Sequence, residues 1–171
     1  MILQLEQERR PQAAPTQEPF SLRFQHMDRL LTSIGLWQHA QGDRPHMRHG
    51  YSIDDEARGL IVGLRHWQQD TAPDFNARMA ATCFQFLRAG ALTQGGYAGY
   101  YHNFCDVEGK WIDSLGSEDS FGRTLWGLGV AHQVDAPFAP RTDAAEMLTR
   151  SLPCIDELHF LRSKAFVILG L

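Results

Sequence analysis

The spacing of apolar residues along the chain predicts a protein built mainly from helices. Apolar side chains recur at three- and four-residue steps, which is the period of an amphipathic helix. The stretches with this period are residues 20–34, 54–69, 74–92, 117–133 and 143–150, and a last apolar run extends from about residue 155 to residue 171. Breakers follow three of them, with Gly35, Gly95 and Pro153 marking helix ends.

One region has the alternation of a strand instead. Tyrosine, phenylalanine, valine and tryptophan alternate over residues 97–112, around a turn at Glu108-Gly109-Lys110. Residues 1–19 are rich in Gln, Glu and Pro and predict a disordered lead. The chain is therefore expected to form an all-α domain over residues 20–171, with one small β-hairpin near residues 104–112.

Composition excludes several functional classes. With 171 residues, a net charge of -4 and a pI near 6.0, the chain is poorly suited to bind nucleic acid or an anionic membrane surface. Cys83, Cys105 and Cys154 are widely spaced, which predicts buried free thiols in a reducing cytoplasm. His46 and His49 lack a third ligand at a characteristic spacing, so we expect no metal site and no other cofactor.

Two short stretches, HGYSIDDEAR at 49–58 and LGSEDSFGR at 115–123, are versions of one pattern. Each has a glycine, a serine, two adjacent acids at a helix start, and an arginine four residues after one of the acids. Ser117 is expected to cap the second helix. Such weak internal repetition is typical of helical hairpins arranged around an axis.

The same residues carry a family resemblance. HGYSIDDEARGLIVGL at 49–64 and NFCDVEGKWIDSLGSEDSFGRTLWGLG at 103–129 resemble the helical domain found fused to, or encoded beside, bacterial glycosyltransferases. Residues 35–40 and 163–166 supply further matches. That domain looks like the six-hairpin glycosidase fold, an (α/α)6 toroid. One position departs from the family pattern, because Glu56 stands where an Asn is expected.

The resemblance implies an incomplete (α/α)6 toroid of antiparallel helical hairpins, about half of the full ring. In such toroids the loops before the inner helices gather on one face and form a carbohydrate cleft. The implied partners are a carbohydrate and either a glycosyltransferase or the missing half of the toroid.

A glycosidase needs two carboxylates, one as a proton donor and one as a base or nucleophile. The two acidic stretches and the segment between them supply the candidate catalytic residues Asp54, Asp55, Asp113, Glu118 and Asp119. The alternative is that these acids only cap helices and complement the helix dipoles.

Other residues near the two stretches are candidates for substrate binding. Loop aromatics can stack on the apolar face of a sugar, a loop histidine can orient an acid or contact a ligand, and the arginines either pair within their helices or hold a sugar hydroxyl or phosphate. These candidates are Trp37, Tyr51, Trp111, His49, Arg58 and Arg123.

The leading hypothesis is a carbohydrate-active domain that cleaves glycosides or processes oligosaccharides with paired carboxylates. The alternatives are a non-catalytic module that binds glycan or associates with a glycosyltransferase, and an inactive fragment of a larger protein. The last helix is apolar nearly all round, so it is expected to need burial against more than this chain supplies, or to self-associate.

Overall fold

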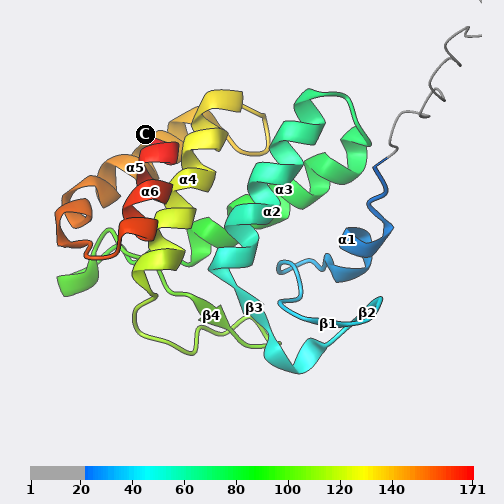
Figure 1. The fold of residues 1–171 in the computed structure, drawn as a ribbon, viewed down its shortest axis with the longest axis horizontal. Coiled ribbons are helices and arrows are strands. Elements are labelled where there is room, and N and C mark those ends of the chain that lie inside the picture. Colours follow the sequence, from blue (N-terminus) through cyan, green and yellow to red (C-terminus); the bar gives the residue numbers. More distant parts are fainter. Residues whose placement is uncertain (1–21) are drawn as a thin grey trace, which may run out of the picture.

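A computed structural model describes residues 22–171, and the predicted N-terminal lead over residues 1–19 lies outside these residues. The described part of the chain is mainly helical (Figure 1). It contains six α-helices, three short 3-10 helices (η1–η3) and four strands of two residues each, which form two small antiparallel pairs. The expected helical class is therefore confirmed.

The first helix is shorter than its apolar spacing predicts. α1 spans only Gln25–Leu30. Leu31 then turns extended and forms an antiparallel bridge with Leu36. The Thr32 hydroxyl accepts the backbone N–H of Gly35 at 3.1 Å, which holds a turn that competes with further helix.

A small hairpin orders the loop after α1. β1 (Ala40–Gln41) pairs antiparallel with β2 (Arg44–Pro45). Gly42 lies in the turn with a φ of +65°, a conformation that favours glycine. The 3-10 helix η1 (Met47–His49) follows, and β3 (Tyr51–Ser52) then leads directly into α2.

The next two helices lie close to their predicted bounds. α2 (Ile53–Gln68) and α3 (Pro73–Ala89) pack against each other as a helical hairpin. Pro73 occupies the first turn of α3, where its missing N–H has no helical partner to lose. The facing sides of the two helices form much of the core, with fully buried side chains at Ala57, Leu60, Leu64, Met79, Cys83, Phe84 and Leu87.

The predicted hairpin near residues 104–112 is present but small. After the 3-10 helix η2 (Gly95–Tyr97), β4 (Phe104–Cys105) folds back so that Cys105 pairs with Trp111. β4 also pairs antiparallel with β3, which apolar periodicity did not predict because β3 is only two residues long. This second pairing joins the first acidic stretch to the segment that leads into the second.

α4 (Glu118–Val134) lies at the centre of the helical layer, where it contacts three other helices. It packs against α2 on one side and against α5 (Arg141–Ser151) and α6 (Leu161–Gly170) on the other (Figure 1). The contact with α6 is close enough that a Cβ added at Gly129 would lie 2.0 Å from the carbonyl oxygen of Gly170. Small residues on α4 therefore let α6 pack on it backbone to backbone.

The last helix begins later than expected. Residues from Leu152 to Glu157 form the 3-10 helix η3, with Pro153 in its first turn, and the α-helix starts only at Leu161. One side of α6 packs on α4, where Ser163 and Val167 are buried. Phe166 is partly buried and stacks on Trp126. Other large apolar side chains of this segment are exposed, as expected for a helix not covered on all sides: Phe160, Leu161, Ile168, Leu169 and Leu171.

The three cysteines match their prediction. Cys83, Cys105 and Cys154 are all buried, and none forms a disulfide. Cys83 lies in the core between α2 and α3, whereas Cys105 belongs to β4 and Cys154 to η3. Burial raises the pKa of each thiol, so all three are held in the protonated form at neutral pH.

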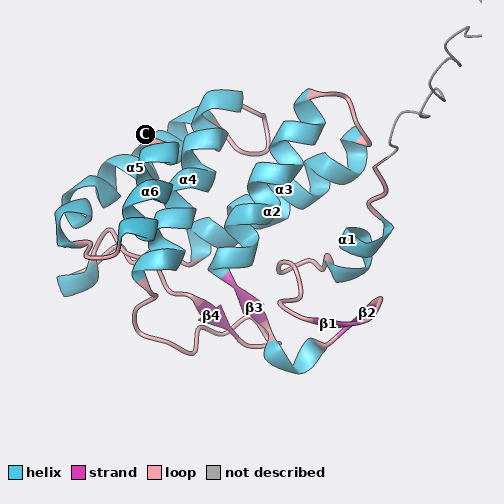
Figure 2. Cartoon of the chain, viewed as in Figure 1, coloured by secondary structure: helices cyan, strands magenta, loops and turns pink. Residues whose placement is uncertain are grey.

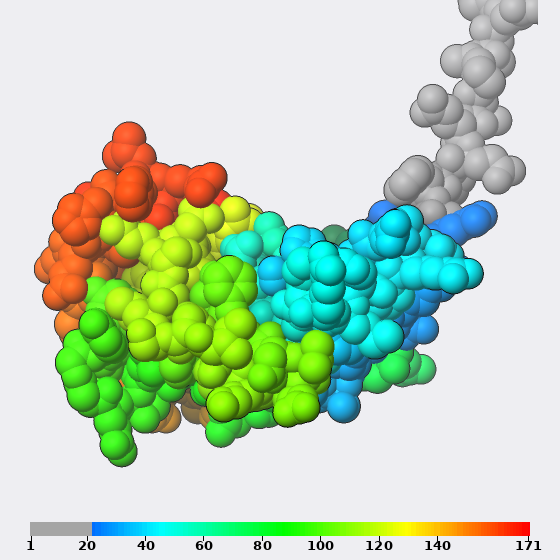
Figure 3. Space-filling model, turned by 90° about the horizontal axis from the view of Figure 1, so that it is seen from below, coloured from blue at the N-terminus to red at the C-terminus, as the bar shows by residue number. Residues whose placement is uncertain are grey.

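Strands and irregular segments gather at one edge of the molecule, next to the first turns of α2 and α4 (Figure 2). Seen from that edge, the loop residues before α2, in cyan, lie beside the residues before α4, in yellow-green (Figure 3). The two acidic stretches, which are more than sixty residues apart in the sequence, therefore share one face.

Candidate functional site

The start of α2 is fixed by a reciprocal capping interaction. The Ser52 hydroxyl accepts the backbone N–H of Asp55 at 3.3 Å and donates to the Asp55 carboxylate at 2.7 Å. Ser52 is buried and belongs to β3, so the cap is also anchored by the strand pair. Asp54 takes no part in this cap.

The start of α4 uses the same device with a different partner. The Ser117 hydroxyl caps the helix by accepting the backbone N–H of Ser120 at 3.1 Å, as predicted. Ser120 takes the place that an acid fills in α2, and its own hydroxyl donates to the Ser117 carbonyl at 2.8 Å. Asp119 is therefore not needed for capping.

One arginine joins the two acidic turns. Arg123 Nε lies 2.7 Å from Asp54 Oδ1, a close contact of opposite charges without hydrogen-bond geometry, and Arg123 Nη2 lies 3.4 Å from Asp119 Oδ2. The Arg123 side chain is only 18% exposed, and its guanidinium also lies over the ring of Phe166, 4.6 Å from the centroid. Because one guanidinium reaches both acids, their carboxylates lie within about 8 Å of each other.

Two further arginines complete a chain of alternating charges. Arg58 pairs with Asp54 at 3.1 Å and with Asp55. Arg162, which comes from α6, pairs with Asp119 at 2.6 Å. The expected pairing of Arg58 and Arg123 within their own helices is present, and the contact from Arg123 to the other helix is additional.

An open cleft of about 420 Å³ lies over these acids. The residues that line it come from both acidic turns, from the first loop and from the segment around β4. Its principal polar side chains are Gln38, Asp54, Asp55, Arg58, Asn103 and Asp119. The cleft is thus the place where carboxylates from two distant stretches meet in contact with solvent.

The carboxyl group of Asp54 has a raised pKa. Partial burial is the main cause, because it removes the charged form from water. Arg58 and Arg123 act in the opposite direction, while the negative charges of Asp55 and Asp119 add to the increase. At Asp54 the effect of partial burial therefore outweighs the attraction of the two arginines.

The Glu118 carboxylate forms its hydrogen bonds outside the cleft, with the segment before α6. Its carboxylate accepts the backbone N–H groups of Phe160 at 3.0 Å and His159 at 2.8 Å, and it also contacts the His159 ring. These amides, Phe160 first, lower the pKa of Glu118. The residue therefore holds the segment that leads into α6 against the start of α4.

The Asp113 carboxylate also binds backbone N–H groups. One of its oxygens accepts the backbone N–H of Asn103 at 2.8 Å, and the other accepts that of Phe104 at 2.9 Å. This interaction closes the hairpin at 104–112 and sets the backbone at the floor of the cleft. Asp113 and Glu118 thus position the segments around the cleft without lining it with free carboxylates.

Of the three predicted aromatic residues, Tyr51 is buried, and Trp37 and Trp111 are partly buried against the core. Tyr51 is 1% exposed, stacks on Trp37 with a centroid separation of 4.5 Å, and binds the Thr32 hydroxyl at 3.2 Å. Trp111 stacks on His102 at 5.1 Å. The aromatic ring that does line the cleft is Phe104, which is 41% exposed and which sequence reasoning missed.

His49 belongs to a cluster of three histidines beside the cleft. Its ring centroid lies 4.7 Å from that of His39 and 4.8 Å from that of His46. Desolvation, followed by the charges of His39, Arg48 and His46, lowers the pKa of His49. In residues 22–171 no group of three or more acidic, histidine or cysteine side chains is arranged to hold a metal ion.

Glu56 lies directly beneath the acidic turn of α2. It is fully buried, and its Oε1 accepts the backbone N–H of Leu36 at 2.5 Å. Burial raises its pKa to about 8, so the group is protonated at neutral pH. A Cβ added at Gly35 would lie 2.3 Å from this oxygen, which explains the glycine there. The position that departs from the family pattern is therefore a buried structural contact.

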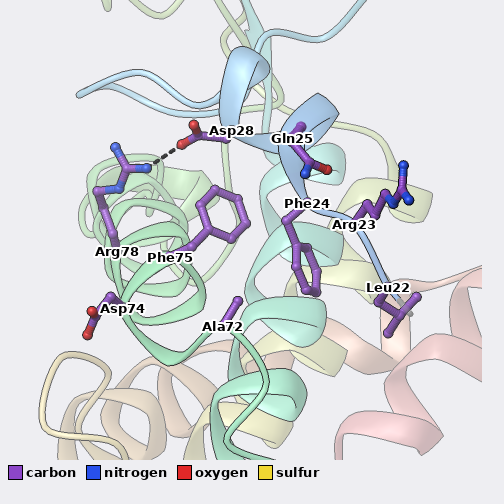
Figure 4. A pocket seen from close by; sticks show the side chains of 9 residues that line it. All are labelled: Leu22, Arg23, Phe24, Gln25, Asp28, Ala72, Asp74, Phe75 and Arg78. Atoms are coloured by element: carbon purple, nitrogen blue, oxygen red, sulfur yellow. Dashed lines mark hydrogen bonds and ion pairs between the residues drawn. The ribbon is translucent and has the colours of Figure 1, made fainter. Parts of the chain in front are cut away.

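A larger hollow of about 570 Å³ lies elsewhere, between α1 and the start of α3 (Figure 4). Phe24 and Phe75 provide apolar walls, and Arg78 pairs with Asp28 at the rim. This hollow contains none of the residues predicted to act on a substrate. We therefore place the candidate site at the acidic cleft.

Gln38 and Asn103 are cleft residues that the sequence did not single out. Neither lies in an acidic pattern or at a helix start, and single amide residues in loops carry no chemical signature. Asn103 enters the site only because β4 pairs with β3, which is a tertiary contact.

No helix within residues 22–171 has both the length and the apolar character needed to cross a membrane. No protein-family model matches the chain, and a comparison with curated proteins found no match. The resemblance to the helical domains associated with glycosyltransferases accordingly stays a prediction.

Proposed function

We propose that the chain is a carbohydrate-active domain that binds an oligosaccharide in the acidic cleft and cleaves a glycosidic bond there. The observation that carries this proposal is the meeting of Asp54 and Asp119 around Arg123. Two carboxylates from separate loops lie within about 8 Å of each other in an open cleft, and this upper limit admits the separations that glycoside hydrolysis uses. The helical hairpins would then form part of a toroid like that of six-hairpin glycosidases.

The two acids differ in their surroundings, and this difference assigns their roles. The raised pKa of Asp54 suits it to donate a proton to the glycosidic oxygen. Asp119, whose carboxylate contacts Arg123 and Arg162, is then left as the base or nucleophile of the pair. Retaining enzymes need about 5–5.5 Å between the carboxyl groups and inverting enzymes about 6.5–9.5 Å, and the separation here is compatible with both.

Other cleft residues suit a sugar ligand. Phe104 presents an exposed ring at the edge of the cleft, where it can stack on the apolar face of a pyranose. Arg58 also lines the cleft, and its side chain is 47% exposed, so the guanidinium can donate to sugar hydroxyls. A hydrophobic platform together with hydrogen-bonding side chains suits a sugar, which has both apolar faces and hydroxyls.

The test is turnover of an oligosaccharide panel by Asp54→Asn and Asp119→Asn, followed by chromatography of the released sugars. Each variant should lose at least about a hundredfold in rate, because each removes one of two required proton-transfer groups. Asp43→Asn is the matched control: Asp43 also pairs with an arginine, at 2.7 Å, but it is 71% exposed on the β1–β2 hairpin. Wild-type rates in both cleft variants would overturn the proposal.

A second candidate is a glycan-binding module without catalysis. It is favoured by the pairing within the cleft, because Asp54, Asp55 and Asp119 all have an arginine or serine partner. Such a module would retain oligosaccharides on an affinity column and release no product from them. Glycan binding without cleavage over a long incubation would therefore favour this candidate over the first.

A further inference from the structure

The Asn103 side chain forms a buried, preorganised polar group at the floor of the acidic cleft. Asn103 is 9% exposed, and its Oδ1 has no hydrogen-bond partner within the described residues. Both backbone groups of the residue are engaged: its N–H donates to Asp113 at 2.8 Å, and its carbonyl accepts the N–H of Ile53 at 2.8 Å. The hydrogen bonds to Asp113 and Ile53 thus fix the backbone of Asn103 and, with it, the position from which the side chain extends.

A second side-chain amide that lines the cleft also has an oxygen without a hydrogen-bond partner within the described residues. Gln38 Oε1 is buried without a partner, and the Gln38 backbone N–H donates to Gly50 at 3.0 Å. Gln38 and Asn103 come from segments far apart in the chain and line the same cleft. Buried polar atoms in folded proteins are nearly always hydrogen-bonded, so two unpaired amide oxygens in one cleft point to a ligand that supplies donors.

The charges of the cleft restrict that ligand further. Among the described residues that line it, Asp54, Asp55 and Asp119 carry carboxylates, whereas Arg58 is the only arginine or lysine. Arg123 lies behind the cleft and is already shared by two of these acids. Arg58, Arg123 and Arg162 are each paired with one or two of these acids, so within the described part of the chain a negatively charged ligand finds no arginine at the cleft that lacks a carboxylate partner.

We propose that the cleft selects uncharged sugar residues over uronic acids and sugar phosphates. In this proposal the side-chain oxygens of Asn103 and Gln38 accept hydrogen bonds from the sugar hydroxyls. A hydroxyl donates to an unpaired amide oxygen, whereas an ionised carboxylate only accepts. The proposal rests on the proposed function, since it names the substrate class of that same site.

The test uses an array of oligosaccharides in matched sets: a neutral hexose oligomer, the same oligomer with a carboxylate at C6, and the same oligomer with a phosphate at C6. Fluorescently labelled full-length protein should bind the neutral members at least tenfold more tightly than their anionic counterparts. Asn103→Ala and Gln38→Ala should each weaken binding of the neutral members by about tenfold, because each removes a partner that the ligand alone satisfies.

Gln133→Ala is the matched control, because Gln133 is an exposed amide near the other end of α4 that binds Arg65 at 2.7 Å. Circular dichroism of each variant checks folding. If Asn103→Ala unfolds, the Gln38→Ala variant still tests the proposal, because Gln38 is less buried.

Equal or tighter binding of the anionic members would overturn the substrate class and leave the proposed function standing. Wild-type binding by folded Asn103→Ala and Gln38→Ala would overturn the role of the amides. If the wild-type protein bound no member, both this proposal and the proposed function would fall.

Discussion

At the scale of single residues, the acidic side chains near the cleft divide by what surrounds them. Asp54 and Asp119 meet an arginine and solvent, whereas Asp113 and Glu118 bind backbone N–H groups. The sequence places all of them in one region but cannot separate these roles. The distinction depends on which backbone amides come within reach, and those amides belong to segments that only the fold brings near.

Glu56 provides a pH-dependent prediction. Its folded-state pKa of about 8 lies above the ordinary value of 4.5, so its contribution to stability is complete below pH 4.5 and is lost as the pH rises through 8. Glu56→Gln stays uncharged and can still accept the N–H of Leu36. Between pH 5 and 8, the wild-type free energy of unfolding should therefore fall relative to that of the variant, by at most about 1.4 kcal/mol per pH unit.

Urea titrations at several pH values provide the measurement for Glu56. Glu146→Gln is the control, because the Glu146 side chain is 71% exposed and its removal should leave the pH dependence unchanged. Parallel stability curves for wild type and Glu56→Gln across this range would show that Glu56 does not hold its proton in the folded protein.

At the scale of elements, the close approach of α4 and α6 gives a second stability prediction. A Cβ added at Gly122 would lie 2.6 Å from the carbonyl oxygen of Ser163, so Gly122→Ala forces the helices apart. We expect a loss of about 1–3 kcal/mol in the free energy of unfolding. The control is Gly96→Ala, because a Cβ at Gly96 meets nothing within 4 Å. If thermal or urea unfolding showed the two variants equally stable, the tight helix contact would be refuted.

The helices were predictable to the extent that local signals define them. Ser117 and the acids after it mark the start of α4, and Pro73 marks the start of α3, because capping and proline effects act within one turn. β3 was not predictable, since two residues carry no alternation and their partner strand lies about fifty residues away. α1 ends early because the Thr32 hydroxyl accepts the N–H of Gly35 and holds a turn there. The apolar spacing continues past this turn, so it predicted a longer helix.

At the scale of the whole molecule, the repeated pattern before α2 and α4 is what links fold to function. Each copy caps a helix, and the β3–β4 pairing together with the α2–α4 contact places the two copies on one face. The shared face was predicted from the repeat. Arg123 was expected to pair within its own helix, and its contact with Asp54 depends on the distance between helices, which no sequence spacing encodes.

The exposed surface of α6 is the feature that the repeat does not explain. Leu161 is 84% exposed and Ile168 is 76% exposed, on a helix whose other side is packed against α4. The sequence predicted that this helix would lack full burial within the chain, and the side-chain exposures agree with that expectation. The toroid and its missing portion stay predictions.

The central claim is that Asp54 and Asp119 act together as one catalytic pair. The most direct measurement compares the rate of oligosaccharide cleavage by Asp54→Asn, Asp119→Asn and the double variant. Residues that work as a unit are not additive, so the double variant should be within about threefold of the slower single variant. Losses that multiply, or a double variant that cleaves at the wild-type rate, would show that the two acids do not form one site.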